Sequence, residues 1–303
     1  MARVARALPP VRGRARAGMW MYQRLGSAAA AAPAPVTVHM RRGHRMRVPV
    51  SSRQTWRALA SGRYDDHEIE LLAPLVKPGC MVLDIGASLG FYTIPLGVMA
   101  RDAGAQVVAI EPLADNCSIL QANVDLNGLA EHVQIMCYAL GESSDREAVF
   151  HVEAGGFGNA WAEPTSPAAD LQVHDRAGRT HDRVVSQVHR LDELTVRWTR
   201  PCTAIKLDVE GLELDVLRGA ERLVGDHRPA ILGEFSPAWL SSRGIAPDAP
   251  LRWAQQHGYR CLELRPTRRH PLAEQHITRS EPLAEGAGRS GALLLLPEEG
   301  SKH

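Results

Sequence analysis

Four carboxylates lie near the ends of apolar segments at separate points of the chain. Asp84 lies in the segment Met81 to Ile85, Glu111 ends a second apolar segment, and Asp208 and Glu210 follow a third. If these segments are parallel strands, their carboxyl ends meet at one edge of a sheet, where open α/β proteins bind ligands. Carboxylates gathered there can accept hydrogen bonds from hydroxyls, pair with a cation or take up a proton.

A glycine-containing turn follows the first segment. Gly86 and Gly90 frame it as G-x-x-x-G, with Ala87 inside, and the glycines allow a tight bend and close backbone approach to a ligand. A dinucleotide site needs the longer pattern G-x-G-x-x-G for its pyrophosphate. S-adenosylmethionine has no phosphate, and it carries an ammonium that Asp84 could attract. The turn therefore favours S-adenosylmethionine over NAD.

Glu111 supplies the second signal. A carboxylate at that strand end can accept hydrogen bonds from both hydroxyls of a ribose. NAD enzymes use an acid in the same way, so Glu111 alone does not separate the two cofactors. Either acid taken singly could also be a helix N-cap or a surface charge. The spaced pair of Asp84 and Glu111, each on an apolar strand, predicts a nucleoside-binding site.

Asp208 and Glu210 supply the third signal. Their position after the fourth parallel segment places them beside the cofactor, where an acceptor must lie, so we predict that they handle the acceptor or the cofactor. Glu210 could instead cap the helix expected from Leu212. With Glu234, both could also bind a divalent cation, although no metal is the favoured reading.

Histidine is the alternative base. His151, His181 and His189 lie in or near a Gly- and Pro-rich segment, and imidazole titrates near neutral pH, so His189 joins the catalytic candidates. With 13 histidines in the chain, any one of them is more often a surface residue. Trp161 and Phe157 of the same segment could line an acceptor pocket or only pack the segment down.

Short apolar segments alternate with amphipathic ones after Cys80, which predicts a doubly wound α/β fold with a mostly parallel seven-stranded sheet. The expected strands are 81–85, 106–111, 133–138, 204–208, 230–235, 260–264 and 292–296, and the expected helices are 91–103, 113–127 and 212–224. Residues 155–178 are predicted to form a long mobile loop over the site.

The N-terminal part has a different character. Every charged residue before Asp65 is basic, and residues 1–35 are predicted to be a disordered leader, with a transit peptide or a nucleic-acid tail as alternatives. Residues 36–79 form an expected β-hairpin and helix, and residues 80–303 the S-adenosylmethionine-binding domain. No apolar run reaches the roughly 20 residues of a membrane span. Five scattered cysteines without zinc spacing are expected to be reduced core thiols of a cytoplasmic protein.

Together these motifs resemble the FkbM family of methyltransferases over about residues 60–240. The shared segments are Val82–Ala87, Glu111–Pro112, Ala139–Gly141, Leu191–Leu194, Ile205–Gly211 and Pro229–Glu234, with Gly90, Tyr92, Thr93, Asn116, Asn123, Glu213, Leu217, Gly219 and Ala220. The resemblance implies O-methylation of a hydroxyl on a saccharide, glycolipid or polyketide-like metabolite. It also adds Pro112, Asn116, Ala139 and Leu140 to the cofactor contacts. Ser88-Leu89 departs from the Asn-Ile or Asn-Val of such proteins, which puts one polar cofactor contact in doubt.

Two other classes of function remain open. A nicotinamide oxidoreductase could use the same fold, although the third glycine is missing. A non-catalytic protein could bind nucleic acid through the basic arm, which is the less favoured reading. The expected partner is a small-molecule or saccharide acceptor, and the sequence leaves a homo-oligomer open.

Overall fold

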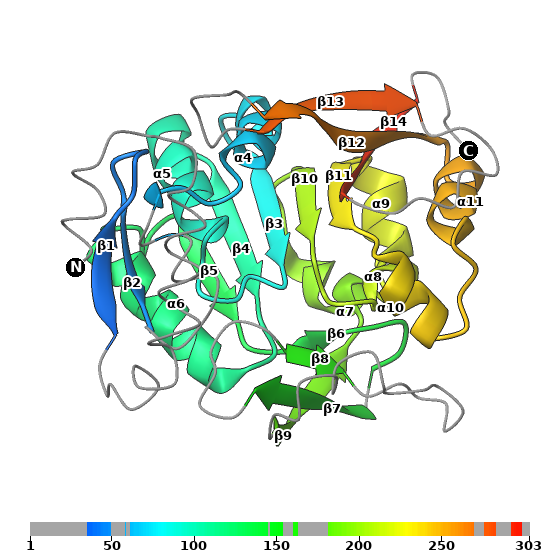
Figure 1. Ribbon diagram of the computed structural model, residues 1–303, viewed down its shortest axis with the longest axis horizontal. Helices are drawn as coiled ribbons and strands as arrows, with labels where there is room; N and C mark the ends of the chain where they lie inside the picture. The colour runs from blue at the N-terminus through cyan, green and yellow to red at the C-terminus, as the bar shows by residue number, and fades with distance from the viewer. Residues whose placement is uncertain are drawn as a thin grey trace.

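The computed structural model, shown in Figure 1, describes residues 35–49, 58, 61–144, 146–153, 160–162, 181–269, 276–282 and 292–298. The predicted leader, apart from Pro35, lies outside these residues. So does the predicted loop 155–178, apart from residues 160–162, and Phe157 lies outside with it.

A central sheet of eight strands organises the described residues, in the order β13-β12-β14-β11-β10-β3-β4-β5 (Figure 1). Its parallel part consists of β5 (Val133–Met136), β4 (Gln106–Ile110), β3 (Met81–Ile85), β10 (Cys202–Leu207) and β11 (Ala230–Glu234). It continues antiparallel through β14 (Ala292–Pro297), β12 (Tyr259–Arg269) and β13 (His276–Pro282). The predicted doubly wound, mostly parallel sheet is confirmed. The eighth strand, β13, has the sequence HITRSEP, which carries too few apolar residues to predict a strand.

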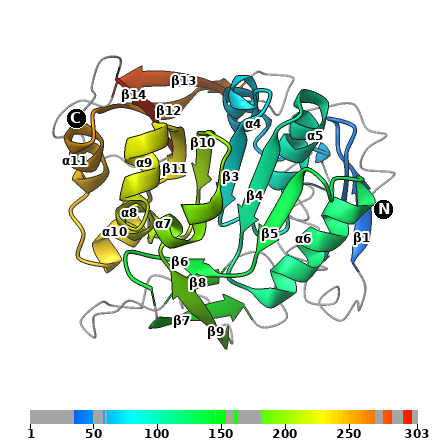
Figure 2. The same cartoon turned by 180° about the vertical axis from the view of Figure 1, so that it is seen from behind.

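Two apolar cores cover the two faces of this sheet. One face packs against α4 (Asp66–Leu72), α5 (Thr93–Ala103) and α6 (Ala114–Leu126). The other face packs against α8 (Glu213–Arg218), α9 (Glu221–His227), α10 (Pro237–Ser242) and α11 (Ala249–Gln256). Side chains of one strand alternate between the cores, with Val82 in the first and Leu83 in the second. Figure 2 shows α8, α9 and α11 on one half of the sheet and α6 on the other.

The predicted single helix 212–224 is wrong. The chain instead forms α8 and α9, separated by Gly219 and Ala220. A Cβ atom at Gly219 would lie 2.1 Å from the carbonyl oxygen of Gly141, so the backbone of this break packs directly on the backbone after β6. That close approach is a tertiary contact, which helical periodicity does not report.

The predicted hairpin forms, with β1 (Val36–His39) antiparallel to β2 (Arg45–Val48). Met46 and Val48 are fully buried in the first core. Asn123 of α6 donates from Nδ2 to the Arg47 carbonyl oxygen at 3.1 Å and to the Leu89 carbonyl oxygen at 2.9 Å. One buried amide therefore ties the hairpin to the chain just before Gly90.

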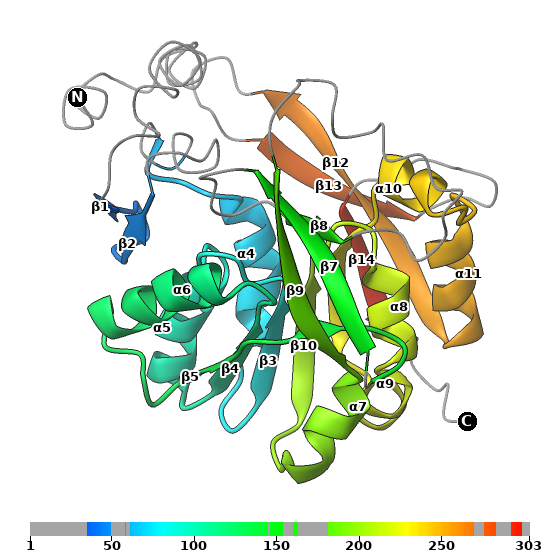
Figure 3. The same cartoon turned by 90° about the horizontal axis from the view of Figure 1, so that it is seen from below.

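A second sheet lies across the carboxyl ends of the central strands (Figures 1 and 3). Its order is β6-β9-β7-β8, from Ala139–Leu140, His181–His189, Arg146–Glu153 and Ala160–Ala162. None of these strands was predicted, and β8 falls inside the segment expected to be a loop. One face packs on a small core that includes Phe150 and Val188, but the apolar Val185 is exposed, so apolar residues do not mark the buried face alone and the alternation is weak.

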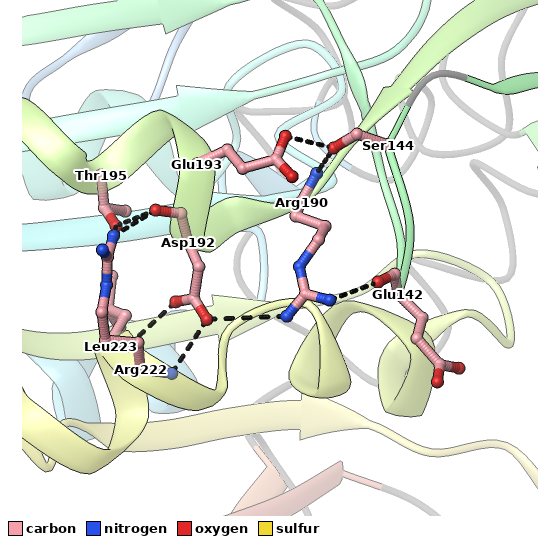
Figure 4. Close-up of polar contacts among 8 residues, drawn as sticks. All are labelled: Glu142, Ser144, Arg190, Asp192, Glu193, Thr195, Arg222 and Leu223. Atoms are coloured by element: carbon pink, nitrogen blue, oxygen red, sulfur yellow. Dashed lines mark hydrogen bonds and ion pairs between the residues drawn. The ribbon is translucent and has the colours of Figure 1, made fainter.

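Polar contacts fix this small sheet to the helices below it (Figure 4). Asp192 follows β9, and its carboxylate accepts hydrogen bonds from the backbone N–H groups of Arg222 at 2.9 Å and Leu223 at 3.0 Å. These groups belong to the first turn of α9, whose unpaired N–H groups favour an anion. The Arg190 backbone N–H donates to Ser144 Oγ at 2.8 Å, and that hydroxyl also donates to Glu193.

The expectation that all five cysteines are thiols is wrong for one pair. Cys117 and Cys137 are joined as a disulfide between the start of α6 and the end of β5, with Cα atoms 6.3 Å apart. Nothing in their spacing predicts this, since β5 and α6 become neighbours only when the sheet forms. Cys80, Cys202 and Cys261 are buried free thiols, as expected.

No helix among the described residues is both long enough and apolar enough to cross a membrane.

Candidate active site

A cleft of about 820 Å³, including space open to solvent, lies at the carboxyl ends of β3, β4 and β10, with the small sheet on its far side. Of the predicted cofactor residues, eight line it: Gly86, Ala87, Glu111, Pro112, Asn116, Ala139, Leu140 and Asp208. Asp84 and Gly90 do not. The cleft therefore gathers most of the predicted residues at the predicted edge of the sheet.

Glu111 accepts hydrogen bonds from three neighbouring groups at one end of the cleft. It follows β4, is 4% exposed, and accepts hydrogen bonds from the Ser88 backbone N–H at 2.8 Å, from Asn116 Nδ2 at 2.9 Å and from the Leu113 backbone N–H at 3.2 Å. Burial raises the pKa of Glu111 in spite of these donors, which act in the opposite sense. The carboxylate thus fixes the glycine turn against β4, and its oxygens can still accept from a ligand hydroxyl.

Gly86 begins the turn in a conformation that other residues avoid. Its φ is +79°, and a Cβ atom there would lie 1.8 Å from the Asp208 carbonyl oxygen. Gly90, at φ +94°, would instead meet Leu120 Cδ1 at 2.6 Å. Gly86 is therefore needed where two strand ends meet beside the cleft, and Gly90 is needed for packing against α6.

Asp84 lies behind the wall of the cleft. It is fully buried, and Thr93 Oγ1 donates to its Oδ2 at 2.5 Å. Burial raises the pKa of Asp84, although Lys206 and Thr93 oppose the shift. Direct contact with a ligand ammonium stays a prediction; the structure shows a carboxylate that supports the end of β3 and faces Lys206.

Lys206 is a site residue that the sequence analysis missed. It pairs with Asp84 across β10 and β3, is 5% exposed, and lines the cleft. Its Nζ donates to Asp208 Oδ2 at 3.3 Å. Burial lowers the pKa of Lys206, but the attraction of Asp208 and Asp84 outweighs it, so the pKa is raised and the side chain is a cation. The sequence signal that could have identified Lys206 as a site residue is a lysine inside an otherwise apolar strand.

Glu210 lines the cleft with Asp208. Burial, followed by the charges of Asp208 and Glu234, raises the pKa of Glu210 to about 8. Its φ is +53°, a left-handed conformation that is unusual for glutamate and is often found at functional sites. The alternative reading of Glu210 as a helix cap is not supported, because α8 begins at Glu213 after Leu212 and has no side-chain cap.

Glu213 stabilises the loop that carries these acids. Its Oε1 accepts hydrogen bonds from the backbone N–H groups of Gly211 at 3.0 Å and Val209 at 3.2 Å. Burial raises the pKa of Glu213 to about 7, against the effect of the Gly211 donor. Burial and Asp208 likewise raise the pKa of Glu234 to about 7 at the end of β11. Three acids around Asp208 therefore bind protons more tightly than free carboxylates do.

His189 and His151 do not line the cleft. His189 packs edge-to-face on Tyr138, with 4.5 Å between the ring centroids, and Tyr138 is the residue that faces the cleft. His151 stacks on Trp161 at 5.5 Å, outside the lining. Within the described ranges, no three His, Cys, Asp or Glu side chains gather closely enough to hold a metal ion.

Aromatic side chains form part of the wall, and the sequence analysis did not assign them. Tyr64 stacks on Phe91 with 4.2 Å between ring centroids, and Tyr92 lies edge-on to Tyr64 at 6.1 Å. The Tyr92 hydroxyl donates to Glu68 Oε2 of α4 at 2.6 Å. Through Tyr64 the N-terminal extension lines the cleft. Tyr64 lies some twenty residues before Gly86, so the two are not close in sequence.

Comparison with protein families matches residues 84–261, more than half of the chain, to the methyltransferase FkbM domain. The chain belongs to the FkbM methyltransferase family. This confirms the family that the motifs resemble, and with it a methyltransferase domain on the doubly wound sheet. No curated protein matches the chain.

Similar solved structures include a methyltransferase FkbM from Methylobacillus flagellatus KT, at 15% identity and a TM-score of 0.40. The match covers 92% of this chain and 60% of the Methylobacillus chain. A SAM-dependent O-methyltransferase from Thermotoga maritima has 13% identity and a TM-score of 0.42, with 87% and 78% covered. A precorrin-6y C5,15-methyltransferase from Geobacter metallireducens GS-15 has 9% identity and a TM-score of 0.40, with 76% and 87% covered. This chain thus spans about 60% of the length of the first.

Proposed function

We propose that the protein is an S-adenosylmethionine-dependent O-methyltransferase that acts on a hydroxyl of a saccharide, glycolipid or polyketide-like metabolite. The observation that carries the proposal is the arrangement around Glu111. A buried carboxylate at the end of β4 fixes the glycine turn and faces a cleft in a chain of the FkbM methyltransferase family.

The residues of the cleft fit S-adenosylmethionine. Glu111 and Asn116 offer polar atoms for a ribose, and the backbone of Gly86 and Ala87 is open to close approach. At the other end, the carboxyl group of Asp208 can attract the sulfonium and the ammonium. Ser88 stands where a dinucleotide site places its second glycine, and its backbone N–H is already bound to Glu111. The fit therefore favours S-adenosylmethionine over a nicotinamide dinucleotide.

When bound, S-adenosylmethionine supplies an activated methyl group, so the protein has to orient an acceptor and receive its proton. Glu210 and Asp208 are the two acids of the β10 loop that reach the cleft. A carboxylate within hydrogen-bond reach of the acceptor hydroxyl takes its proton as the new bond forms. The aromatic wall of Tyr64, Phe91 and Tyr92 excludes water, and flat rings also suit the faces of a sugar.

The proposed function is tested by calorimetry on the full-length protein. We expect S-adenosylhomocysteine and S-adenosylmethionine to bind, and NADH not to bind. Binding of NADH alone would favour the oxidoreductase. Salt-dependent binding of nucleic acid that disappears when residues 1–35 are removed, without binding of S-adenosylmethionine, would favour the nucleic-acid alternative. An acceptor screen of glycans and glycosylated metabolites then tests the substrate class.

Glu210→Gln is expected to lower kcat by about 10² to 10⁴, the usual contribution of a general base, with little change in the affinity for S-adenosylhomocysteine. A base must be deprotonated, and Glu210 has a pKa of about 8, so the wild-type rate should rise as the pH increases through about 8. The measurement is a pH–rate profile of both proteins. Glu221→Gln, at an exposed position of α9, is the matched control and should change neither.

Asp208→Asn should lower kcat at least about tenfold. If Glu210→Gln and Asp208→Asn both turn over normally, with no effect of EDTA, the base is elsewhere, and His189 behind Tyr138 is the next candidate. Loss of activity with EDTA that magnesium restores would indicate metal binding by the same carboxylates.

A further inference from the structure

Lys206 is the only cationic side chain that lines the cleft among the described residues. Glu111, Asp208 and Glu210 line the same cleft, so acidic side chains outnumber basic ones there. The chain has three lysines, Lys77, Lys206 and Lys302; of the two that the structure describes, Lys206 lies within a strand of the central sheet and Lys77 does not. A positive charge at this place therefore needs an explanation beyond surface solubility.

The surroundings of Lys206 leave part of its hydrogen-bonding capacity unused. An ammonium group has three N–H donors. Among the described residues, Asp208 is the one hydrogen-bond acceptor, at 3.3 Å, because Asp84 Oδ1 lies 4.0 Å away. The ring of Tyr92 takes up another side of the ammonium, with 4.7 Å from Nζ to the ring centroid. A buried ammonium gains from an additional acceptor, and Lys206 lines the cleft, where a ligand can supply one.

One carboxylate oxygen of Asp84 also lacks a hydrogen-bond partner. Its Oδ2 is bound by Thr93, but its Oδ1 is buried without a hydrogen-bond partner. Lys206 thus forms an ion pair with Asp84, with 4.0 Å between Nζ and Oδ1, and it also lines the cleft. The three residues Asp84, Lys206 and Asp208 form a line of alternating charge that runs from the core to the cleft beside Gly86.

We propose that Lys206 binds the carboxylate at the amino-acid end of S-adenosylmethionine, which makes it a cofactor-recognition residue. The inference rests on the proposed function. A ligand carboxylate in this acidic cleft needs a cationic partner, and among the described residues Lys206 is the cation that lines the cleft. The amino-acid end would thereby lie at β10 and the nucleoside end at Glu111 on β4, with β3 and its glycine turn between them.

Calorimetry with matched ligands tests this on the full chain. S-adenosylhomocysteine carries the carboxylate and the ammonium, its decarboxylated analogue keeps only the ammonium, and methylthioadenosine lacks both. Lys206→Met should weaken S-adenosylhomocysteine by about tenfold to a hundredfold, the range for a charged hydrogen bond, and should change methylthioadenosine by less than about twofold. Lys77→Met makes the same substitution at an exposed position and should change neither.

The wild-type protein provides a test that needs no variant. It should bind S-adenosylhomocysteine more tightly than the decarboxylated analogue, and this preference should vanish in Lys206→Met. Equal affinity of the wild type for the two ligands would overturn the inference. Equal weakening of S-adenosylhomocysteine and methylthioadenosine by Lys206→Met would show that Lys206 only maintains the cleft, which also overturns it.

Two further comparisons distinguish a loss of folding from a loss of ligand recognition, and the proposed function from the role of Lys206. Lys206→Met leaves Asp84 buried without a counter-charge, so Asp84→Asn/Lys206→Met is measured beside it; the loss of discrimination should persist in the double variant. If the wild type binds neither S-adenosylhomocysteine nor methylthioadenosine, the proposed function fails. If it binds both with equal affinity, the proposed function stands and the role of Lys206 fails.

Discussion

Gly86→Ala is expected to abolish cofactor binding and to lower the free energy of unfolding by about 2 to 5 kcal/mol, the sum of a left-handed backbone penalty and an overpacking penalty. The new Cβ would lie 1.8 Å from the Asp208 carbonyl oxygen and 2.8 Å from its carbonyl carbon. Both are backbone atoms, which cannot rotate away as a side chain can. The glycine turn or the β10 end must move, and both line the cleft.

Gly79→Ala is the matched control for this prediction. Gly79 has φ +74°, close to the +79° of Gly86, but a Cβ there meets nothing within 4 Å. It should therefore show the backbone penalty alone, about 1 to 2 kcal/mol, and normal binding. Urea denaturation gives the free energies, and calorimetry with S-adenosylhomocysteine gives the affinities. Equal effects of the two substitutions would show that the contact between Gly86 and Asp208 is not limiting.

Glu111→Ala is expected to weaken S-adenosylhomocysteine by about 1.5 to 3 kcal/mol, the scale of hydrogen bonds to a charged group. The structure adds an effect that the sequence did not predict. Three protein donors, from Ser88, Asn116 and Leu113, lose their acceptor, so stability should fall as well, by about 1 to 3 kcal/mol for buried groups left unpaired.

Two comparisons separate the ligand effect of Glu111 from its structural effect. Glu131→Ala, at an exposed position, should change neither affinity nor stability. Asn116→Ala removes one partner of Glu111 but keeps its carboxylate, so it should reduce affinity less than Glu111→Ala does. Affinity that is unchanged in Glu111→Ala, with lowered stability, would mean that the carboxylate is only a scaffold for the turn.

The sequence by itself determined the parallel strands and the acids at their ends. An apolar run such as Met81–Ile85 is long enough for a strand, and its bounds were predicted without error because burial on both faces leaves no polar position within it except Asp84. The spacing of Gly86 and Glu111 then predicted one edge of the sheet, since parallel strands bring their carboxyl ends together. These are local patterns, and local patterns are what a sequence records directly.

Only the tertiary structure decided how those residues are used. The sequence shows Lys206 only as a lysine within an apolar strand, and the folded chain places it beside Asp84 of β3. The complete burial of Asp84 is likewise visible only in the folded chain. The break at Gly219 and the pairing of Cys117 with Cys137 likewise depend on segments that meet only in the folded chain. Proximity, burial and the resulting pKa shifts depend on contacts between distant residues, and such contacts leave no period or spacing in the sequence of either partner.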